Sequence, residues 1–257
     1  MKMRRLGLLV IAVAIFAGHS AAQSITVAAA ADLNFALSEL AQEFQAASGT
    51  KVTLSFGASG NLFSQIQAGA PFDIFFSADE EYPRKLAASG ALDAASVRTY
   101  AVGHLVLWVP TAAPFNPKQL KMDSLMQSSV TRIALANPQH APYGKAALAA
   151  LEHYGLKDIV SAKFVFGESV SQAAQFVHSG NAQAGLIALS LARSPAMVSA
   201  GKYWEVPQEA YPELRQAVGI VSRSTNKKAA QAFLDFVLSV EAAATLQKYG
   251  LTPPVQP

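Results

Sequence analysis

Four loops in this sequence share a pattern that could bind an anion. In each loop a short apolar stretch ends in small residues, and a helical pattern begins directly afterwards. The loops contain residues 31–32, 57–60, 142–144 and 169–170. The first N–H groups of a helix have no intrahelical acceptor, and the helix dipole places roughly +0.5 elementary charge there. Helix starts that met at one place would therefore hold an anion without lysine or arginine.

Each loop taken singly also has a simpler interpretation. Small residues after a strand commonly form the turn that connects it to the next helix, with no role in binding. Four helix starts that converged would together supply a partial charge of roughly +2, which matches a dianion. The hypothesis therefore depends on whether the fold brings the four loops together.

One of these loops also suggests a serine nucleophile. Gly57 stands two residues before Ser59 in a strand–turn–helix context. The nucleophile pattern Gly-x-Ser-x-Gly requires a second glycine at position 61, where the sequence has asparagine. The histidines that could act as a base have no recognisable partner motif; they are His104, His140, His153 and His178. An exported serine hydrolase is the alternative from another functional class.

Acidic residues are dense in the segment that follows residue 72. A hard cation would prefer such oxygen ligands, but acidic residues equally suit the solvated first turn of a helix. The residues concerned are Asp73, Asp79, Glu80 and Glu81. The chain has no cysteine, no His-Glu-x-x-His and no Gly-x-x-x-x-Gly-Lys-Ser/Thr motif. We therefore expect no resident metal, nucleotide or other cofactor.

The elements around the loops alternate between strand and helix. Short β-rich stretches are expected as strands at 25–27, 51–56, 73–76, 132–136, 163–166, 184–188 and 217–221. Apolar residues at helical spacing separate most of them, which predicts α/β units with parallel sheets. A longer β-rich stretch at 99–109 is followed by three prolines, which indicates a crossing between domains. The aromatic pairs in 75–76 and 164–166 are expected in core strands.

The first residues predict export from the cytoplasm. Lys2, Arg4 and Arg5 precede an apolar run at 6–17, and small residues at 20–22 form a cleavage site near Ala22. A retained membrane anchor is the alternative, but the run is shorter than the roughly 20 residues of a span. We therefore expect a signal peptide at 1–22 and a location in the periplasm.

Charge argues against nucleic acid as a partner. The full chain has 20 Lys+Arg and 17 Asp+Glu, a formal charge of +3. The three basic residues of the signal segment account for this excess, so the mature chain is formally neutral. Nucleic-acid-binding proteins instead carry a clustered basic surface.

The loops, taken in order, resemble those of a known family. Residues 25–33 and 55–60 are similar to the first two ligand loops of the periplasmic molybdate-binding proteins of ABC importers. The resemblance continues through 69–79, 137–144 and 167–170, so it covers nearly the whole mature chain. It implies a monomeric protein that is not an enzyme and that delivers molybdate, and also tungstate, to a membrane permease.

The resemblance also implies the architecture. It is the α/β fold of a two-lobed type II periplasmic binding protein, in which each lobe is a mostly parallel sheet flanked by helices. The ligand cleft lies between the lobes. We expect lobe 1 at 23–102 and 216–257, lobe 2 at 103–215, and hinges near 102–105 and 214–217.

The family's ligand contacts carry over to five positions. Ser59 would donate its hydroxyl and N–H, Tyr143 its phenol and also its N–H, and Val170 its N–H to the oxyanion, with no direct bond to the metal. The turn at Ala31 and Asp32 occupies the remaining contact, where family members often have Ser, Thr or Asn. A carboxylate facing a dianion would be repelled, so we expect Asp32 to donate its N–H and to cap the following helix with its carboxylate.

One alternative ligand follows from the same turn. A carboxylate inside the site could accept the proton of hydrogen phosphate, which a fully deprotonated dianion does not have. A binding protein for phosphate or another protonated oxyanion is therefore the second candidate within the same class.

Overall fold

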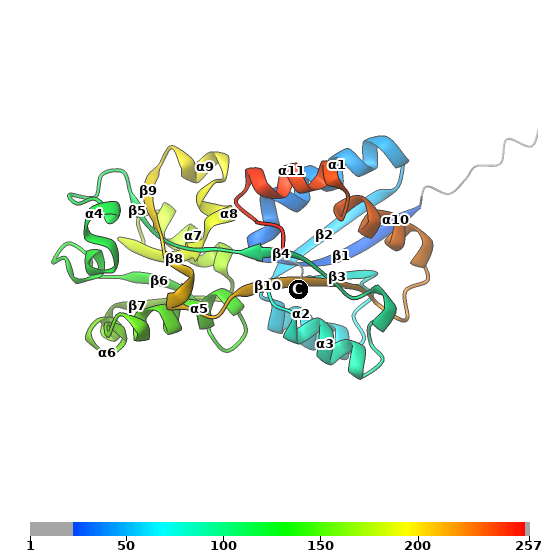
Figure 1. Ribbon diagram of the computed structural model, residues 1–257, viewed down its shortest axis with the longest axis horizontal. Coiled ribbons are helices and arrows are strands. Elements are labelled where there is room, and N and C mark those ends of the chain that lie inside the picture. Colours follow the sequence, from blue (N-terminus) through cyan, green and yellow to red (C-terminus); the bar gives the residue numbers. More distant parts are fainter. Residues whose placement is uncertain (1–22, 255–257) are drawn as a thin grey trace, which may run out of the picture.

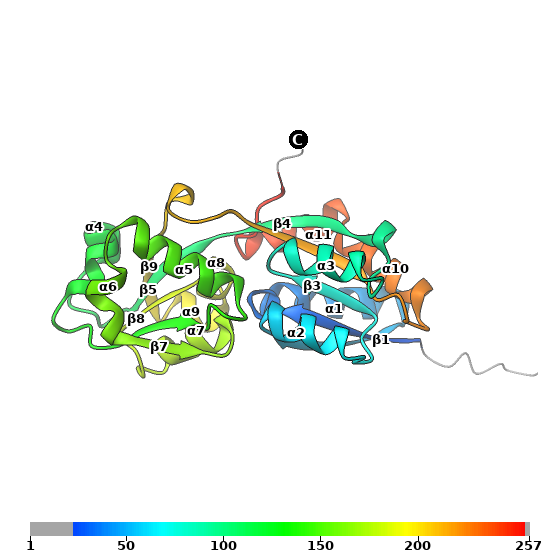
Figure 2. The same cartoon turned by 90° about the horizontal axis from the view of Figure 1, so that it is seen from below.

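The protein has two lobes side by side, each built on one five-stranded sheet (Figures 1 and 2). The structure is a computed structural model that describes residues 23–254. The expected signal peptide at 1–22 lies outside the described residues.

The two sheets are built alike. The first has the order β2-β1-β3-β10-β4 and the second β7-β6-β8-β5-β9. Their bounds are β1 (Ser24–Ala30), β2 (Lys51–Gly57), β3 (Ile74–Ser77), β4 (Arg98–Gly103) and β10 (Leu214–Ile220), then β5 (Leu105–Pro110), β6 (Ile133–Ala136), β7 (Phe164–Gly167), β8 (Ala184–Ala188) and β9 (Gly201–Glu205). In the first sheet β10 is antiparallel to both of its neighbours, and in the second sheet β5 is antiparallel to both of its neighbours. The other strand pairs are parallel. The expected fold class, with mostly parallel sheets, is confirmed.

Helices cover both faces of each sheet. The first lobe contains α1 (Asn34–Ser48), α2 (Ser59–Gln67), α3 (Glu81–Ala88), α10 (Lys227–Val237) and α11 (Val240–Lys248). The second contains α4 (Pro117–Leu120), α5 (Pro142–His153), α6 (Lys157–Val160), α7 (Val170–His178), α8 (Leu189–Ala192) and α9 (Pro195–Val198). Within residues 23–254, no single helix has the length and apolar character of a membrane span. Among the described helices, only α10 and α11 taken together reach that length and apolar character, and the two are bent by 65° relative to each other.

The apolar pattern of β1 explains why helices are needed on both faces. Val27 and Ala29 lie in the core beneath α1 and α10, whereas Ala28 lies in the core beneath α2 and α3. Successive side chains of a strand point to opposite faces, so a strand covered on both sides reads as a continuous apolar run. Helix α1 buries Leu37 and Leu40 against this strand.

The chain passes between the lobes at two places. The expected single stretch at 99–109 is two strands, because β4 pairs in the first sheet and β5 in the second, with His104 between them. The chain returns between β9 and β10. Strand β10 begins at Leu214, three residues earlier than the sequence pattern indicated, so the hinge expected at 214–217 falls inside it.

Two features of the second sheet differ from the sequence interpretation. Strand β9 was not anticipated, since its pattern contains Lys202 and Glu205. Strand β7 is an edge strand, and Phe166 within it is 48% exposed, so it is not the core strand that its aromatic residues suggested. In contrast, Phe75 and Phe76 of β3 are fully buried.

Candidate functional site

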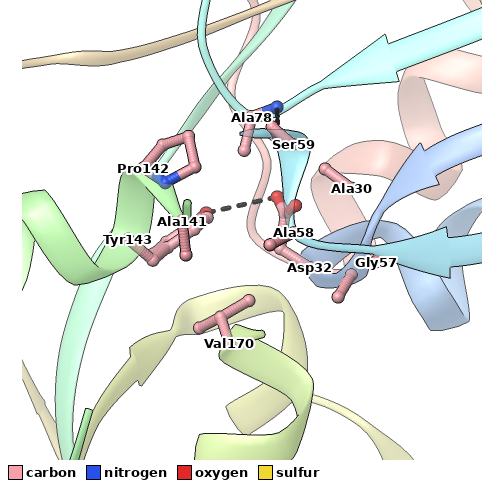
Figure 3. A pocket seen from close by; sticks show the side chains of 11 residues that line it. Ala30, Asp32, Gly57, Ala58, Ser59, Ala78, Ala141, Pro142, Tyr143 and Val170 are labelled. Atoms are coloured by element: carbon pink, nitrogen blue, oxygen red, sulfur yellow. Dashed lines mark hydrogen bonds between the residues drawn. The ribbon is translucent and has the colours of Figure 1, made fainter. Parts of the chain in front are cut away.

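The four loops identified in the sequence, at 31–32, 57–60, 142–144 and 169–170, meet at one pocket between the lobes (Figure 3). Its volume is about 190 Å³, including its mouth. All five residues selected from the sequence line it, together with six others; the full set is Ala30, Ala31, Asp32, Gly57, Ala58, Ser59, Ala78, Ala141, Pro142, Tyr143 and Val170. The convergence on which the anion hypothesis depends is therefore present in the fold.

Strand ends and helix starts position these residues. Strand β1 ends at Ala30 and continues into a 3-10 turn, and β2 ends at Gly57 just before α2. From the other lobe, α5 follows β6 and α7 follows β7. In open α/β sheets, ligands bind outside the carboxyl ends of the strands, and both lobes present those ends to this pocket.

Local sequence favours the two helix starts that come from the second lobe. Pro142 occupies the first turn of α5, where its missing N–H costs nothing and its fixed φ suits the helix. Ser169 caps α7, with its Oγ accepting from the N–H of Gln172 at 3.3 Å. As in any helix, the first N–H groups of α5 and α7 have no intrahelical acceptor.

Three backbone donors in the pocket are free. Among residues 23–254, the N–H groups of Ser59, Tyr143 and Val170 donate to no protein acceptor. The Ser59 hydroxyl oxygen accepts from the N–H of Ala78 at 2.9 Å. Its own hydrogen can still rotate toward a ligand.

Asp32 does not adopt the arrangement expected from the sequence. It is 1% exposed, and its carboxylate caps no helix. Instead Oδ2 accepts from Gln216 Nε2 at 2.6 Å. It also accepts from the Tyr143 hydroxyl at 3.3 Å (Figure 3). Side-chain donors from two other elements outcompete the nearby helix amides, so the N-cap expectation is wrong.

A hydrogen-bonded chain connects Asp32 to both strands that cross between the lobes. Gln216 lies in β10, and its Oε1 accepts from the Tyr100 hydroxyl of β4 at 2.6 Å. Both side chains are buried. At Gly103 of β4, a Cβ atom would lie 2.3 Å from the Tyr143 hydroxyl, so only glycine leaves room for this chain of contacts.

Burial controls the electrostatics of the pocket. Neither lysine nor arginine is among the residues that line it. Loss of solvent around Asp32 raises the pKa of its carboxyl to about 6, against the opposing effect of hydrogen bonds from Gln216, its own backbone and Tyr143. Burial likewise raises the pKa of the Tyr143 phenol well above its ordinary value.

The lobes touch around the pocket. The N–H of Gly60 in α2 donates to the carbonyl of His140 at 2.8 Å, and Ser190 Oγ in α8 donates to the carbonyl of Asp32 at 2.7 Å. Lys145 of α5 also lies over the ring of Tyr82 in α3, 5.6 Å from its centroid. Each contact has at least one partner in a segment next to the pocket: α2, α5 or the turn at Asp32.

The acidic segment has structural contacts of its own. Asp73 accepts from the N–H of Thr26 at 2.7 Å, and Asp79 accepts from the N–H of Tyr82 at 3.1 Å. Glu80 pairs with Arg215, and Glu81 with Lys85. Within residues 23–254, no three or more His, Cys, Asp or Glu side chains form a group suited to a metal ion.

Sequence reasoning missed Gln216, Tyr100 and Ser190. The signal for Gln216 was a polar side chain inside an apolar strand, but placing the start of that strand at 217 left it outside. Tyr100 and Ser190 had no local signal, because their roles depend on which strands and helices become neighbours.

Fold and pocket together define an extracellular solute-binding protein. Residues 25–252 match the family model of bacterial extracellular solute-binding proteins, and the chain belongs to this family.

Several relatives of this chain are named for molybdate. Molybdate-binding protein ModA of Azotobacter vinelandii is 37% identical over 229 residues, covering 89% of this chain and 90% of the relative. ModA of Rhodobacter capsulatus is 35% identical over 231 residues, covering 90% of this chain and 89% of the relative. The solved periplasmic molybdate-binding protein of A. vinelandii has a TM-score of 0.84 and 35% identity, covering 90% of this chain and 100% of that structure. These relatives are named as binding proteins, not as enzymes.

Proposed function

We propose that this protein captures molybdate outside the cytoplasm and delivers it to the membrane permease of an ABC importer. The observation that carries the proposal is the convergence of three free helix-start N–H groups on one small pocket without a lysine or arginine. Molybdate-binding relatives at 37% and 35% identity support the choice of this anion.

The donors give the site its preference for dianions. A fully deprotonated tetrahedral anion has acceptors only, so N–H and hydroxyl groups suit all of its oxygens. A protonated anion would bring a hydrogen that a site lined by donors cannot accept. Tungstate shares the shape and charge of molybdate and is a proposed second ligand. Sulfate is also a fully deprotonated dianion, so the site must distinguish it from molybdate by the spacing of the donors.

We assign the contacts as follows. Ser59 donates its hydroxyl and its N–H, Val170 donates its N–H, and the Ala31–Asp32 turn completes the site. Tyr143 contributes its N–H and its phenol, whose hydrogen bond to Asp32 is long at 3.3 Å and can be shared with an anion.

Capture involves closure of the lobes. We take 23–102 with 216–257 and 103–215 as the two lobes, with bending where the chain crosses between them. Contacts across the pocket, such as that of Gly60 with His140, support a closed form that a permease would recognise. We further propose that residues 1–22 direct export and are removed near Ala22, and that the mature protein acts as a monomer, binds no nucleic acid and catalyses no reaction.

Titration calorimetry on the mature protein tests the proposal. Molybdate and tungstate are expected to bind with one site per chain and to be displaced by neither sulfate nor phosphate at equal concentration. The Ser59→Ala variant measured in parallel reports whether the heat arises at this pocket. Absence of molybdate binding, or equal affinity for all four anions, would contradict the proposed function.

One observation favours a second candidate. The buried carboxylate of Asp32 lines the pocket, and a charged carboxylate could accept the hydrogen of hydrogen phosphate. If phosphate displaces molybdate at equal concentration, a protonated oxyanion is the natural ligand.

A further inference from the structure

The carboxyl of Asp32 presents a difficulty for a dianion site. It is buried, it lines the pocket, and no lysine or arginine lines the pocket to compensate its charge. Repulsion between like charges strengthens as water is excluded. The inference below rests on the proposed function, because it concerns how a dianion is accommodated beside this carboxyl.

Hydrogen bonds determine which oxygen of Asp32 can carry a proton. The Tyr100 hydroxyl donates to Gln216 Oε1 at 2.6 Å, which leaves Gln216 Nε2 facing Asp32 Oδ2 at 2.6 Å. An amide nitrogen has hydrogens to give and no lone pair to accept with. Oδ2 must therefore act as an acceptor.

The other carboxyl oxygen of Asp32, Oδ1, has no such donor facing it. Among the buried side-chain atoms of residues 23–254, Asp32 Oδ1 is one of the few without a hydrogen-bond partner. Figure 3 shows the carboxyl group in the middle of the residues that line the pocket. An unpaired, buried carboxylate oxygen is costly, whereas a protonated one becomes a donor to whatever occupies the pocket.

We propose that molybdate binding is coupled to the uptake of one proton by Asp32, which then donates a hydrogen bond from Oδ1 to the anion. The proton comes from solvent and remains on the carboxyl, and no bond within the anion forms or breaks. Asp32 thus becomes a neutral donor, consistent with the other donors in the pocket.

Within residues 23–254, no other group that faces or contacts Asp32 titrates near neutral pH. Tyr143 of α5 and Tyr100 of β4 face it, and burial raises the pKa of both phenols well above the ordinary value. Gln216 of β10 and Ser190 of α8 contact it and do not ionise. Charged side chains make no contribution to the pKa of Asp32, which burial raises to about 6.

The coupling predicts how affinity varies with pH. Above pH 6 the free protein is increasingly charged at Asp32, so the fraction ready to bind falls about tenfold for each pH unit. The apparent dissociation constant for molybdate should rise by the same factor. Below pH 6 the affinity should become independent of pH, as long as molybdate itself stays deprotonated.

Calorimetry of the wild-type protein tests the coupling without any variant. Molybdate is titrated at about pH 7.5 in two buffers that differ in ionisation enthalpy. The difference in observed heat gives the number of protons taken up, and we expect a value close to one. Binding without proton uptake and without pH dependence overturns the coupling but leaves molybdate capture standing.

The Asp32→Asn variant tests the assignment to this residue. Its amide oxygen can accept from Gln216, and its Nδ2 donates where the protonated Oδ1 would. We expect no proton uptake, flat affinity between about pH 6 and 8.5, and binding about 30-fold tighter than wild type at pH 7.5.

Asp79→Asn is the matched control. Asp79 is a half-buried carboxyl of the first lobe whose pKa is also raised by burial, but it does not line the pocket. An asparagine there can still accept from the N–H of Tyr82. This variant should keep the wild-type proton uptake. If it loses the uptake while Asp32→Asn retains it, the assignment to Asp32 is wrong.

The two proposals fail in different ways. If wild-type protein binds no molybdate anywhere between about pH 5.5 and 8.5, the proposed function fails, and the inference fails with it. If wild-type protein binds molybdate without taking up a proton, the inference alone is overturned. If hydrogen phosphate binds more tightly than molybdate and takes up no proton, Asp32 remains charged and acts as an acceptor, and both proposals are overturned.

Discussion

The N–H of Gly60 donates to the carbonyl oxygen of His140 at 2.8 Å, and this bond joins the two lobes beside the pocket. Gly60 is in the first turn of α2, and His140 precedes α5. Both segments also supply residues that line the pocket, Ser59 and Tyr143. Lobe closure and anion binding therefore depend on the same two helix starts.

Gly60→Ala should hinder closure. A Cβ atom at this position would lie 2.8 Å from the carbonyl oxygen of His140, which is backbone and cannot rotate away. We expect molybdate binding to weaken by about 1 to 3 kcal/mol, the usual cost of such crowding. Small-angle scattering should show that the lobes compact less on adding molybdate. Gln65→Ala, an exposed change on the same helix, is the control, and equal compaction in both variants would contradict this role.

Ser59→Ala should weaken molybdate binding by about 1 to 3 kcal/mol, because it removes one hydroxyl donor to a charged ligand. The same change leaves the N–H of Ala78 without its acceptor, so melting temperature must be measured alongside affinity. Ser64→Ala removes a hydroxyl from the same helix outside the pocket and should bind normally. Unchanged affinity in Ser59→Ala would remove its hydroxyl from the site.

Tyr143→Phe should also weaken binding by about 1 to 3 kcal/mol if the phenol donates to the anion. The phenol also lowers the pKa of Asp32, so its loss should move the midpoint of the pH dependence upward. Calorimetry across a pH series measures both effects. Tyr154→Phe, just beyond α5 and outside the pocket, is the matched control. A shift of affinity in the control but not in Tyr143→Phe would refute the assignment.

Much of the fold follows from local patterns. The apolar spacing in α1 and its end at Gly49, where φ is 71°, agree with the sequence because these features depend on neighbouring residues only. The sequence could not show that residues 99–109 form two strands, because β4 and β5 differ only in the sheet that they join. The direction of the Asp32 side chain was equally hidden, because Gln216 is 184 residues away.

The ligand-free protein offers a last check on Asp32. Burial raises the pKa of its carboxyl from 3.8 to about 6, so the folded protein holds this proton more tightly than the unfolded chain does. Stability should therefore fall as pH rises from about 4 to 6, and the penalty then stays constant at higher pH. A shift of two pKa units corresponds to about 3 kcal/mol.

Asp32→Asn should remove this penalty. At about pH 8 we expect urea unfolding to show the variant more stable than wild type by as much as about 3 kcal/mol, because no charge is buried. The advantage should become small near pH 4, where the folded carboxyl is protonated and the unfolded one is roughly half protonated. Asp79→Asn provides the comparison for a carboxyl outside the pocket. An Asp32→Asn variant that is equally destabilised at both pH values would mean that the hydrogen bonds to Asp32 fully offset the cost of burying its charge.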